Sequence, residues 1–370
     1  MASLENQPNP AIPSCANSEA DLNPNIAFVS AMEMASSLIL PMVLRAALEL
    51  DLLEIIARAG PDAQLSASMV TSQLPTQNPD APMMVDRILR FLASHSMLTC
   101  SHVTHENGRV ERLYGLAPLS FFFVGNQGPD ITGFIKLLTH KAYFESWYQL
   151  KDAVLEGGTP FDKAHGMSMF EYAATDPGFS EIFTKSVAKA NLSIMEQILV
   201  KYNGFENAKV VVDVGGGIGA MLNLITSKYP TIKGINFDLP HVIQNAPSYT
   251  GAENVGGDMF VSVPRGDVIL LKAVLHNWND DQCLKLLMTC YKALPDHGKV
   301  VVIDGVLPEV PEPNNEAKLA FRTDILMMVQ HIGGKERTVK EFEELAKGAG
   351  FIGTKVVCCV LNHCVIEFYK

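Results

Sequence analysis

The chain has 370 residues, of which 48% are hydrophobic and 19% are charged, and its formal net charge is −11 at pH 7. This composition predicts a globular protein of two or three domains and excludes a disordered, collagen-like or coiled-coil chain. The acidic charge, with no run of Lys and Arg to offset it, argues against nucleic acid as a partner.

The N-terminal region predicts neither secretion nor membrane insertion. Residues 1–25 are rich in Asn, Pro and Ser, which is typical of a poorly ordered segment. No basic segment followed by an apolar one opens the chain, so no secretory signal is expected. The most apolar stretch, residues 27–50, contains two Glu, one Pro and one Arg, which a membrane span would not carry at mid-depth. Seven scattered cysteines are expected to be reduced thiols, so we expect a cytoplasmic protein.

The first third of the chain predicts helices followed by a two-stranded wing. Apolar residues recur at spacings of three and four from residue 25 to about residue 98. A hairpin is expected over 98–103 and 110–116, because a turn-like segment joins two short apolar runs. Winged helices often bind DNA, but the candidate recognition helix offers only Arg87 and Arg90. So many apolar helix faces favour a subunit interface, hence a homodimer.

The second half predicts a parallel sheet covered by helices. Residues 130–205 predict further helices, after which short apolar runs alternate with helical patterns such as 280–294. The expected strands are 209–214, 234–237, 267–271 and 299–303. A helix is expected to begin after Thr338, which forms a capping box with Glu341, and strands 354–360 and 363–369 close the chain as a hairpin. The expected divisions are 1–25, 26–130, 131–205 and 206–370.

A glycine cluster at the end of the first of these strands is the strongest local motif, Asp213-Val-Gly215-Gly-Gly217-Ile-Gly219. Glycines here let the backbone approach a ligand closely and turn tightly into a helix. Gly215, Gly217 and Ala220 fit the dinucleotide fingerprint of nicotinamide enzymes. Gly215, Gly217 and Gly219 after Asp213 fit the nucleoside loop of methyltransferases. A purely structural turn is a third interpretation, and the glycines alone do not decide.

Two acids further along the chain favour one of these interpretations. Asp238 ends the next apolar run, where a carboxylate can accept hydrogen bonds from both ribose hydroxyls of either cofactor. Asp258 has apolar neighbours suited to an adenine ring, although an Asp after two glycines is also an ordinary turn residue. Because both acids fit the ends of successive strands, they favour S-adenosylmethionine over a nicotinamide.

His276 follows the strand expected at 267–271, at the edge where ligands bind in open α/β sheets. A histidine there can take a proton from an acidic hydroxyl near neutral pH, whereas the structural alternative is a loop histidine held by hydrogen bonds. Asp304, at the end of the next strand, and Glu336, before a helix, could orient the imidazole. Glu336 could instead stabilise the N-terminus of that helix.

The cysteines do not predict a metal site. Cys358, Cys359, His363 and Cys364 lie close in sequence, but adjacent cysteines on a strand point to opposite faces and no second C-x-x-C is present. Cys283 and Cys290 lie seven residues apart on one face of the helix expected at 280–294, so we expect them in the core.

Six runs carry a resemblance to a known family. They are FESW at 144–147, LKDAVLEGG at 150–158, DVGGG at 213–217, INFDLPH at 235–241, VGGDMF at 255–260 and GGKERT at 333–338. From about residue 25 to the C-terminus the chain resembles the plant caffeic acid O-methyltransferases, small-molecule methyltransferases that use S-adenosylmethionine.

The resemblance implies an α/β fold, in which a Rossmann-like methyltransferase domain follows a mainly helical winged-helix dimerisation domain. It implies S-adenosylmethionine as cofactor, S-adenosylhomocysteine as product, and no metal. The implied cofactor contacts are Gly215, Asp238, Asp258, Met259 and Lys272. The implied catalytic base is His276, with Asp304 and Glu336 as its supporting acids.

The chain departs from the family pattern around the base. The family usually has Glu where Asp304 stands, and Asp is one methylene shorter, so its contact with His276 is expected to be looser or water-mediated. Asn277 stands where the family usually has Asp, and Ala273 stands where it usually has Trp.

The implied substrate pocket departs more strongly. Positions that often hold Asn, His, His and Asn in the caffeate-type pocket are here Leu138, Ala173, Ala190 and His331. Tyr143 places a phenol where an aliphatic residue is usual. The remaining walls are implied to be Met169, Phe179, Phe183, Val187, Leu326 and Met327. Caffeate would lose polar partners here, at a cost of about 1–3 kcal/mol each, so a flatter and less polar aromatic acceptor is favoured.

The first functional hypothesis is therefore methyl transfer from S-adenosylmethionine to a hydroxyl of an aromatic plant metabolite. N-methylation of an anthranilate-, quinolone- or acridone-type amine is the alternative, since an aryl amine already carries a lone pair and depends less on a base. A nicotinamide oxidoreductase and a non-catalytic dimeric binding protein remain as hypotheses of other classes.

Overall fold

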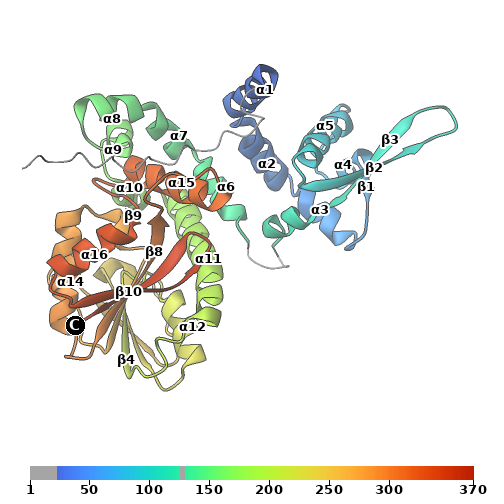
Figure 1. Cartoon of the computed structure of the whole chain (residues 1–370). Helices are drawn as coiled ribbons and strands as arrows, with labels where there is room; N and C mark the ends of the chain where they lie inside the picture. Colours follow the sequence, from blue (N-terminus) through green and yellow to red (C-terminus); the bar gives the residue numbers. More distant parts are fainter. Residues whose placement is uncertain (1–22, 126–129) are drawn as a thin grey trace, which may run out of the picture.

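The computed structural model describes residues 23–125 and 130–370, without the side chain of Ala190. Figure 1 shows two parts, a smaller helical part with a protruding hairpin and a larger part built around a central sheet. Most of the segment expected to be poorly ordered, residues 1–25, lies outside the described residues. Its end does not, because the first helix already begins at Pro24, with Asn23 as its N-cap.

The smaller part confirms the expected helices and wing. Its helices are α1 (Pro24–Ala35), α2 (Ile39–Glu49), α3 (Leu52–Arg58), α4 (Ala67–Thr71) and α5 (Ala81–Ser94). Its strands are β1 (Leu65–Ser66), β2 (Leu98–Thr104) and β3 (Val110–Leu116), in the order β1-β3-β2, and the 3-10 helix η2 (Pro118–Phe123) follows. Helices α2 to α5 bury a common apolar cluster that includes Leu52, Ile56 and Leu89.

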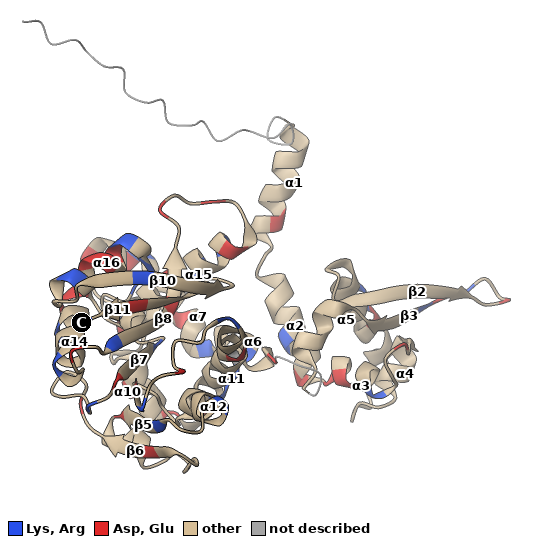
Figure 2. Cartoon of the chain, turned by 60° about the horizontal axis from the view of Figure 1, so that its bottom comes forward, with Lys and Arg blue, Asp and Glu red and all other residues tan. Residues whose placement is uncertain are grey.

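Helix α1 differs from the other α-helices of the smaller part because it buries none of its residues. It projects away from both parts of the chain, and it carries a single charged residue, Glu33 (Figure 2). Phe28, Val29 and Met32 are all exposed on it. The exposed apolar surface of α1 therefore lacks the partner surface that normally covers apolar residues.

A series of helices connects the two parts, as expected for residues 130–205. They are α6 (Thr132–Leu138), α7 (Lys141–Tyr148), α8 (Leu150–Glu156), α9 (Pro160–His165), α10 (Met169–Thr175) and α11 (Pro177–Lys201). The long helix α11 continues into the larger part and packs against α12 (Ala220–Lys228).

The larger part is an eight-stranded, mostly parallel sheet. The order along the sheet is β10-β11-β8-β7-β4-β5-β6, with the short β9 (Arg337–Thr338) beside β8. The strands are β4 (Val210–Val214), β5 (Lys233–Asp238), β6 (Ala252–Gly256), β7 (Val268–Lys272), β8 (Lys299–Leu307), β10 (Gly353–Val360) and β11 (His363–Tyr369). This confirms the expected strands and the closing hairpin. Only β11 and β10 run antiparallel to their neighbours.

Alternating strand residues bury against helices on the two faces, the arrangement of a Rossmann-like domain. Val212 and Val302 face α14 (Asp280–Ala293) and α16 (Val339–Gly348), whereas Val211 and Val301 face α11 and α12. Cys283 and Cys290 are fully buried on α14, as predicted. The predicted capping box of α16 is present.

The expected elements of this part did not include α13 (Pro240–Ile243) or α15 (Asn315–Gln330). The strand β6 was expected only through its end near Asp258, without a residue range. Within the described ranges no single helix is long and apolar enough to cross a membrane, although the bent pair α1 and α2 would meet that test together.

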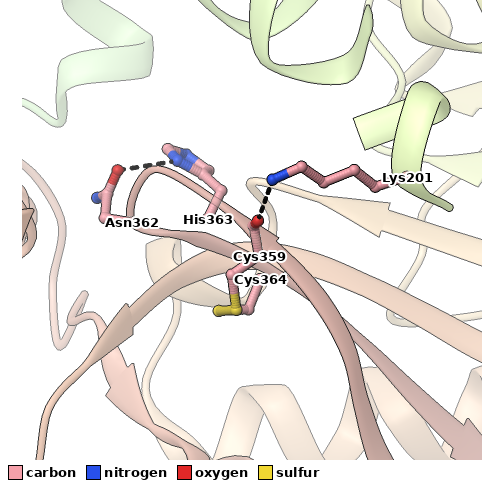
Figure 3. The surroundings of a disulfide bond; sticks show 5 residues. All are labelled: Lys201, Cys359, Asn362, His363 and Cys364. Carbon is pink, nitrogen blue, oxygen red and sulfur yellow. Dashed lines mark hydrogen bonds between the residues drawn. A yellow bond between two sulfur atoms is a disulfide. The ribbon is translucent and has the colours of Figure 1, made fainter. Parts of the chain in front are cut away.

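The prediction that all cysteines are reduced is wrong for one pair. Cys359 of β10 and Cys364 of β11 form a disulfide (Figure 3). The antiparallel register places these two residues directly opposite each other, with their Cα atoms 4.1 Å apart. The expected strands 354–360 and 363–369 already imply this register across a two-residue turn, but the pairing was not predicted because all cysteines were expected to be reduced. The described cysteines that remain free are Cys100, Cys283, Cys290 and Cys358.

Candidate active site

The carboxyl ends of β4, β5, β6 and β7 meet at one edge of the sheet, because these neighbouring strands are parallel. The glycine loop follows β4 and runs into α12, which begins at Ala220. Gly215, Gly217 and Gly219 all have positive φ angles, which side chains other than glycine rarely adopt. The residues at which glycine was predicted to matter therefore shape the turn itself.

Two further contacts fix the loop against β5. The backbone N–H of Gly217 donates to Oδ2 of Asp238 at 2.8 Å, and Nδ2 of Asn236 donates to the carbonyl of Gly217 at 3.1 Å. A Cβ at Gly216 would lie 2.3 Å from Oδ1 of Asn236. The middle glycine is therefore needed for close packing, a role that the motif analysis did not assign.

The acids expected to bind a nucleoside lie on adjacent loops. The N–H of Gly257 donates to the carbonyl of Asp238 at 2.9 Å, which joins the loop after β6 to the end of β5. Asp258 accepts a hydrogen bond from the N–H of Phe260 at 2.8 Å. Met259 is partly buried against the core below the loop.

These residues fit the nucleoside of S-adenosylmethionine. An added Cβ at Gly217 would meet nothing within 4 Å, so the backbone is open to a close approach at that point. Asp238 and Asp258 are carboxylates suited to ribose hydroxyls and to an adenine amino group, respectively. These acceptors match the hydroxyl and amino donors of that nucleoside.

Behind the loop lie two buried charged groups. Burial raises the pKa of Asp213 to about 7, and the nearby carboxylate of Asp238 adds to this rise. Burial lowers the pKa of Lys272 to about 8, against the opposing effect of the nearby acids. Nζ of Lys272 donates to Oδ1 of Asn191 on α11 at 2.8 Å. Asn191 was not predicted, because nothing in the sequence links it to a lysine that lies 81 residues away.

His276 lies in η3 (Leu275–Asn277), immediately beyond β7. Its Nδ1 is 2.9 Å from Oε1 of Glu336, whose side chain is almost fully buried. Burial alone would lower the pKa of His276, but the charge and hydrogen bond of Glu336 outweigh it and raise that pKa. The cap of α16 is supplied by Thr338 and Glu341 instead, so the alternative role of Glu336 at that helix is not needed.

Asp304 lies on β8 near the same histidine but makes no direct bond to it. Both of its carboxylate oxygens are buried without a hydrogen-bond partner in the described part of the chain. Burial raises the pKa of Asp304, while the positive charges of His276 and Lys272 act in the opposite direction. The arrangement agrees with the looser contact expected of an acid one methylene shorter than Glu.

Six of the predicted substrate-pocket residues form one apolar cluster between the connecting helices and α15. They are Tyr143, Met169, Phe179, Phe183, Val187 and Leu326. Ala173, one of the three polar-to-apolar changes, packs against the same cluster. The hydroxyl of the buried Tyr143 lies 3.6 Å from Sδ of Met169, so its surroundings are almost entirely apolar.

Leu138, Met327 and His331, also predicted to line the pocket, lie outside this cluster. His331 is buried, and its ring packs against Phe170 with the centroids 5.2 Å apart. Burial and the charge of His276 lower the pKa of His331 to about 3, so this imidazole is neutral. Leu138 is partly buried and Met327 is buried. The side chain of Ala190 is not among those described.

Comparison with known proteins identifies two matching domain families. An O-methyltransferase domain matches residues 147–352, and an O-methyltransferase dimerisation domain matches residues 32–126. The caffeic acid 3-O-methyltransferase of Medicago sativa is 55% identical over 341 residues, which cover 92% of this chain and 93% of that protein. Caffeic acid 3-O-methyltransferase 1 of Populus tremuloides is 54% identical over 345 residues, with coverage of 93% and 94%.

Solved structures share the fold. Human N-acetylserotonin methyltransferase in complex with SAM has a TM-score of 0.79 at 22% identity, covering 96% of this chain and 99% of its own. LaPhzM has a TM-score of 0.76 at 28% identity, covering 94% of this chain and 100% of its own. Both the helical dimerisation part and the sheet part therefore have counterparts in solved structures.

Proposed function

Because the chain belongs to the O-methyltransferase family of the plant caffeic acid 3-O-methyltransferases, and is thus an S-adenosylmethionine-dependent O-methyltransferase, we propose that its acceptor is a phenolic plant metabolite less polar than caffeate. The observation that carries the proposal is the His276–Glu336 pair together with the apolar aromatic cluster. Helix α15 links the two, because Leu326 belongs to the cluster and Asp324 accepts a hydrogen bond from the backbone N–H of Glu336. Membership in this family leaves no role for a nicotinamide oxidoreductase.

The cofactor would be held by the glycine loop and by the residues at the ends of the next strands. Gly215 and Asp238 would bind the nucleoside, Asp258 and Met259 would contact the adenine, and Lys272 would lie behind it. S-adenosylmethionine supplies an electrophilic methyl group when it is bound. Holding that methyl group and the acceptor in line accounts for most of the rate in this proposal.

His276 acts as the general base. Glu336 accepts a hydrogen bond from Nδ1 of the imidazole, which leaves Nε2 free to accept a proton. The acceptor hydroxyl would give its proton to Nε2 while its oxygen–methyl bond forms and the methyl–sulfur bond breaks, which releases S-adenosylhomocysteine. Glu336 would stabilise the imidazolium that results. The proton then leaves to solvent.

The pocket would select for an apolar acceptor. Phe179 and Phe183 stack with their ring centroids 6.2 Å apart, and Tyr172 and Phe161 add edge contacts around the same cluster. Apart from the tyrosine hydroxyls, these side chains offer no hydrogen-bond partner to the carboxylate and catechol of caffeate, and each unmet hydrogen bond costs about 1–3 kcal/mol. Neutral His331 is the polar group we assign to orient the acceptor.

The proposal is tested by measuring kcat/KM on paired phenols that differ only in a carboxylate. We expect the enzyme to prefer the uncharged phenol and to use caffeate poorly. Leu138→Asn should raise the relative kcat/KM for caffeate, whereas Leu119→Asn, an exposed leucine in η2, should not. Equal or better use of caffeate by the wild type would contradict the proposed specificity.

N-methylation is the second candidate, and the position of Asp304 favours it. A base that has lost one of its two direct acid contacts is less well held for phenol deprotonation, whereas an aryl amine needs a base only after its nitrogen has attacked. An acceptor panel that includes anthranilate-, quinolone- and acridone-type amines decides between the two candidates.

We further propose that the enzyme is a cytoplasmic homodimer with no nucleic-acid or membrane partner. The matched dimerisation domain and the exposed apolar face of α1 support the homodimer, and the net charge of −11 argues against a nucleic-acid partner. We retain residues 26–130 as the dimerisation unit, residues 131–205 as the connection that contributes to the pocket, and residues 206–370 as the methyltransferase unit. A non-catalytic role for the dimer would be supported only by cofactor binding without turnover.

A further inference from the structure

Three successive residues contact the short turn that carries His276. The backbone N–H of Lys335 donates to the carbonyl of His276 at 2.9 Å. The carboxylate of Glu336 accepts from the imidazole Nδ1 at 2.9 Å. The guanidinium of Arg337 donates to the carbonyl of Leu275 at 2.9 Å and to that of Trp278 at 2.8 Å. The backbone of the turn is thus held on both sides of the histidine.

Arg337 is unusual for a charged residue. Its side chain is fully buried, and it is the largest side chain of the described residues in that state. Its Nε and one terminal nitrogen also donate to Oδ1 of Asp280, at 3.0 and 2.7 Å. Asp280 therefore holds the guanidinium in one orientation. Oδ2 of Asp280 lies 3.1 Å from Nζ of Lys335. Asp280 therefore couples the side chains of Lys335 and Arg337.

We propose that Arg337 is a positioning residue for the base: its guanidinium bridges the carbonyls of Leu275 and Trp278 and thereby sets the imidazole of His276 against Glu336. This inference rests on the proposed role of His276. Arg337 itself lies under the turn and acts through the backbone of η3. None of the motifs considered in the sequence assigns it a function.

The chemistry of the site explains why arginine is required there. Burying a charged group is costly, and an apolar side chain of similar volume usually serves stability as well or better. A guanidinium, however, presents several donors in one rigid plane and can satisfy two carbonyls and a carboxylate together. Gly305 provides space on the other side, because a Cβ there would lie 2.7 Å from Oε2 of Glu336.

The pKa of His276 depends on its contact with Glu336 and can be measured without a methyl acceptor. The charged and titratable groups that face His276 are Glu336, Asp304 on β8, Lys272 on β7, His331 after α15 and His363 on β11. Glu336 raises that pKa through its charge and its hydrogen bond. A shift of the turn lengthens the hydrogen bond and lowers the pKa of His276, while the other groups stay in place.

The test uses Arg337→Lys and Asp280→Asn in the full-length enzyme. A lysine keeps the charge but cannot bridge two carbonyls and Asp280 at once. Asp280→Asn keeps the buried arginine and weakens its orientation, so it is the variant to measure if Arg337→Lys fails to fold. Glu49→Gln is the matched control, because Glu49 pairs with Arg45 and its side chain is 49% exposed against 53% for Asp280.

Two quantities are measured, the pKa of His276 by NMR of labelled histidine and kcat with KM for S-adenosylmethionine. We expect the pKa of His276 to fall in both variants, and kcat to fall about 10- to 100-fold in Arg337→Lys with KM for the cofactor unchanged. Glu49→Gln should match the wild type. A folded variant with an unchanged His276 pKa and unchanged kcat would overturn the proposal.

Failure of the proposed function gives a different result. If the wild type methylates no phenol but the pKa of His276 still falls in the two variants, the base assignment is wrong and the positioning contact stands. If only the melting temperature falls, Arg337 is a structural residue and the inference is wrong.

Discussion

Nδ1 of His276 and Oε1 of Glu336 lie 2.9 Å apart, and both side chains are largely removed from solvent. This contact joins the turn after β7 to the segment before α16, 60 residues further along the chain. In the proposed mechanism this contact leaves Nε2 of His276 free to accept a proton and makes Glu336 the acid that supports the base.

Glu336→Gln should therefore lower kcat at neutral pH by about 10- to 100-fold, as expected for losing 1.5–3 kcal/mol of a charged hydrogen bond. Because Glu336 raises the pKa of His276, its removal lowers that pKa. Neutral His276 then persists to lower pH, so the acidic limb of the profile of kcat/KM against pH shifts to lower pH. A pH–rate profile checks both effects, and a limb that stays in place or moves up would contradict the pairing.

Asp304→Asn should have a smaller effect on activity, below about tenfold, because Asp304 makes no hydrogen bond to His276 in the described structure. Its effect on stability should be clear. The pKa of Asp304 in the folded state lies above its ordinary value of 3.8, so the folded enzyme keeps a proton that the unfolded chain has released. Stability should then fall as the pH rises above about 4.

Urea unfolding at several pH values measures this fall, which Asp304→Asn should remove. Equal pH dependence in the wild type and the variant would show that Asp304 is not the group responsible. A loss of activity as large as that of Glu336→Gln would show that both acids hold the base.

Charges on α1 should separate the proposed dimer. Val29 and Met32 are exposed on a helix that buries nothing within its own chain. Placing Asp at both positions should disfavour association, because charged groups would be buried in the interface. Light scattering after size-exclusion chromatography should give a monomer for this variant and a dimer for the wild type. Glu33→Gln on the same helix should remain dimeric, and a dimeric double variant would exclude α1 from the interface.

The cross-strand disulfide should protect two of the seven cysteines from alkylation. Denatured, unreduced protein treated with iodoacetamide should retain Cys359 and Cys364 as a linked peptide in mass spectra. Prior reduction should release both thiols. Alkylation of all seven cysteines without reduction would show that the bond is not formed in solution.

The sequence predicted those elements whose own residue pattern determines their secondary structure. Val210 to Val214 and Val268 to Lys272 are apolar except for Asp213 and Lys272, a pattern typical of central parallel strands, and both are strands. The range of the strand Ala252–Gly256 was not predicted, because it is an edge strand of mixed burial with no apolar run. Local pattern carries little information about such a strand.

The candidate site likewise contains residues that the sequence could predict and contacts that it could not. His276 and Glu336 could be proposed because each follows or precedes a recognisable element, and the structure brings them into contact. The contact of Asn191 with Lys272 and the bridge made by Arg337 depend on packing between distant segments. Neither contact is encoded in a short motif.

The most direct test of the account is methyl transfer by the wild type and by His276→Ala on a panel of phenols and aryl amines, followed by mass spectrometry. Binding of S-adenosylhomocysteine, measured by calorimetry, controls for an intact cofactor site. We predict that the wild type methylates apolar phenols and that His276→Ala loses this activity by about 10²- to 10⁴-fold while still binding the product. Phenol methylation near the wild-type rate in His276→Ala, or methyl gain on amines alone, would contradict the central claim.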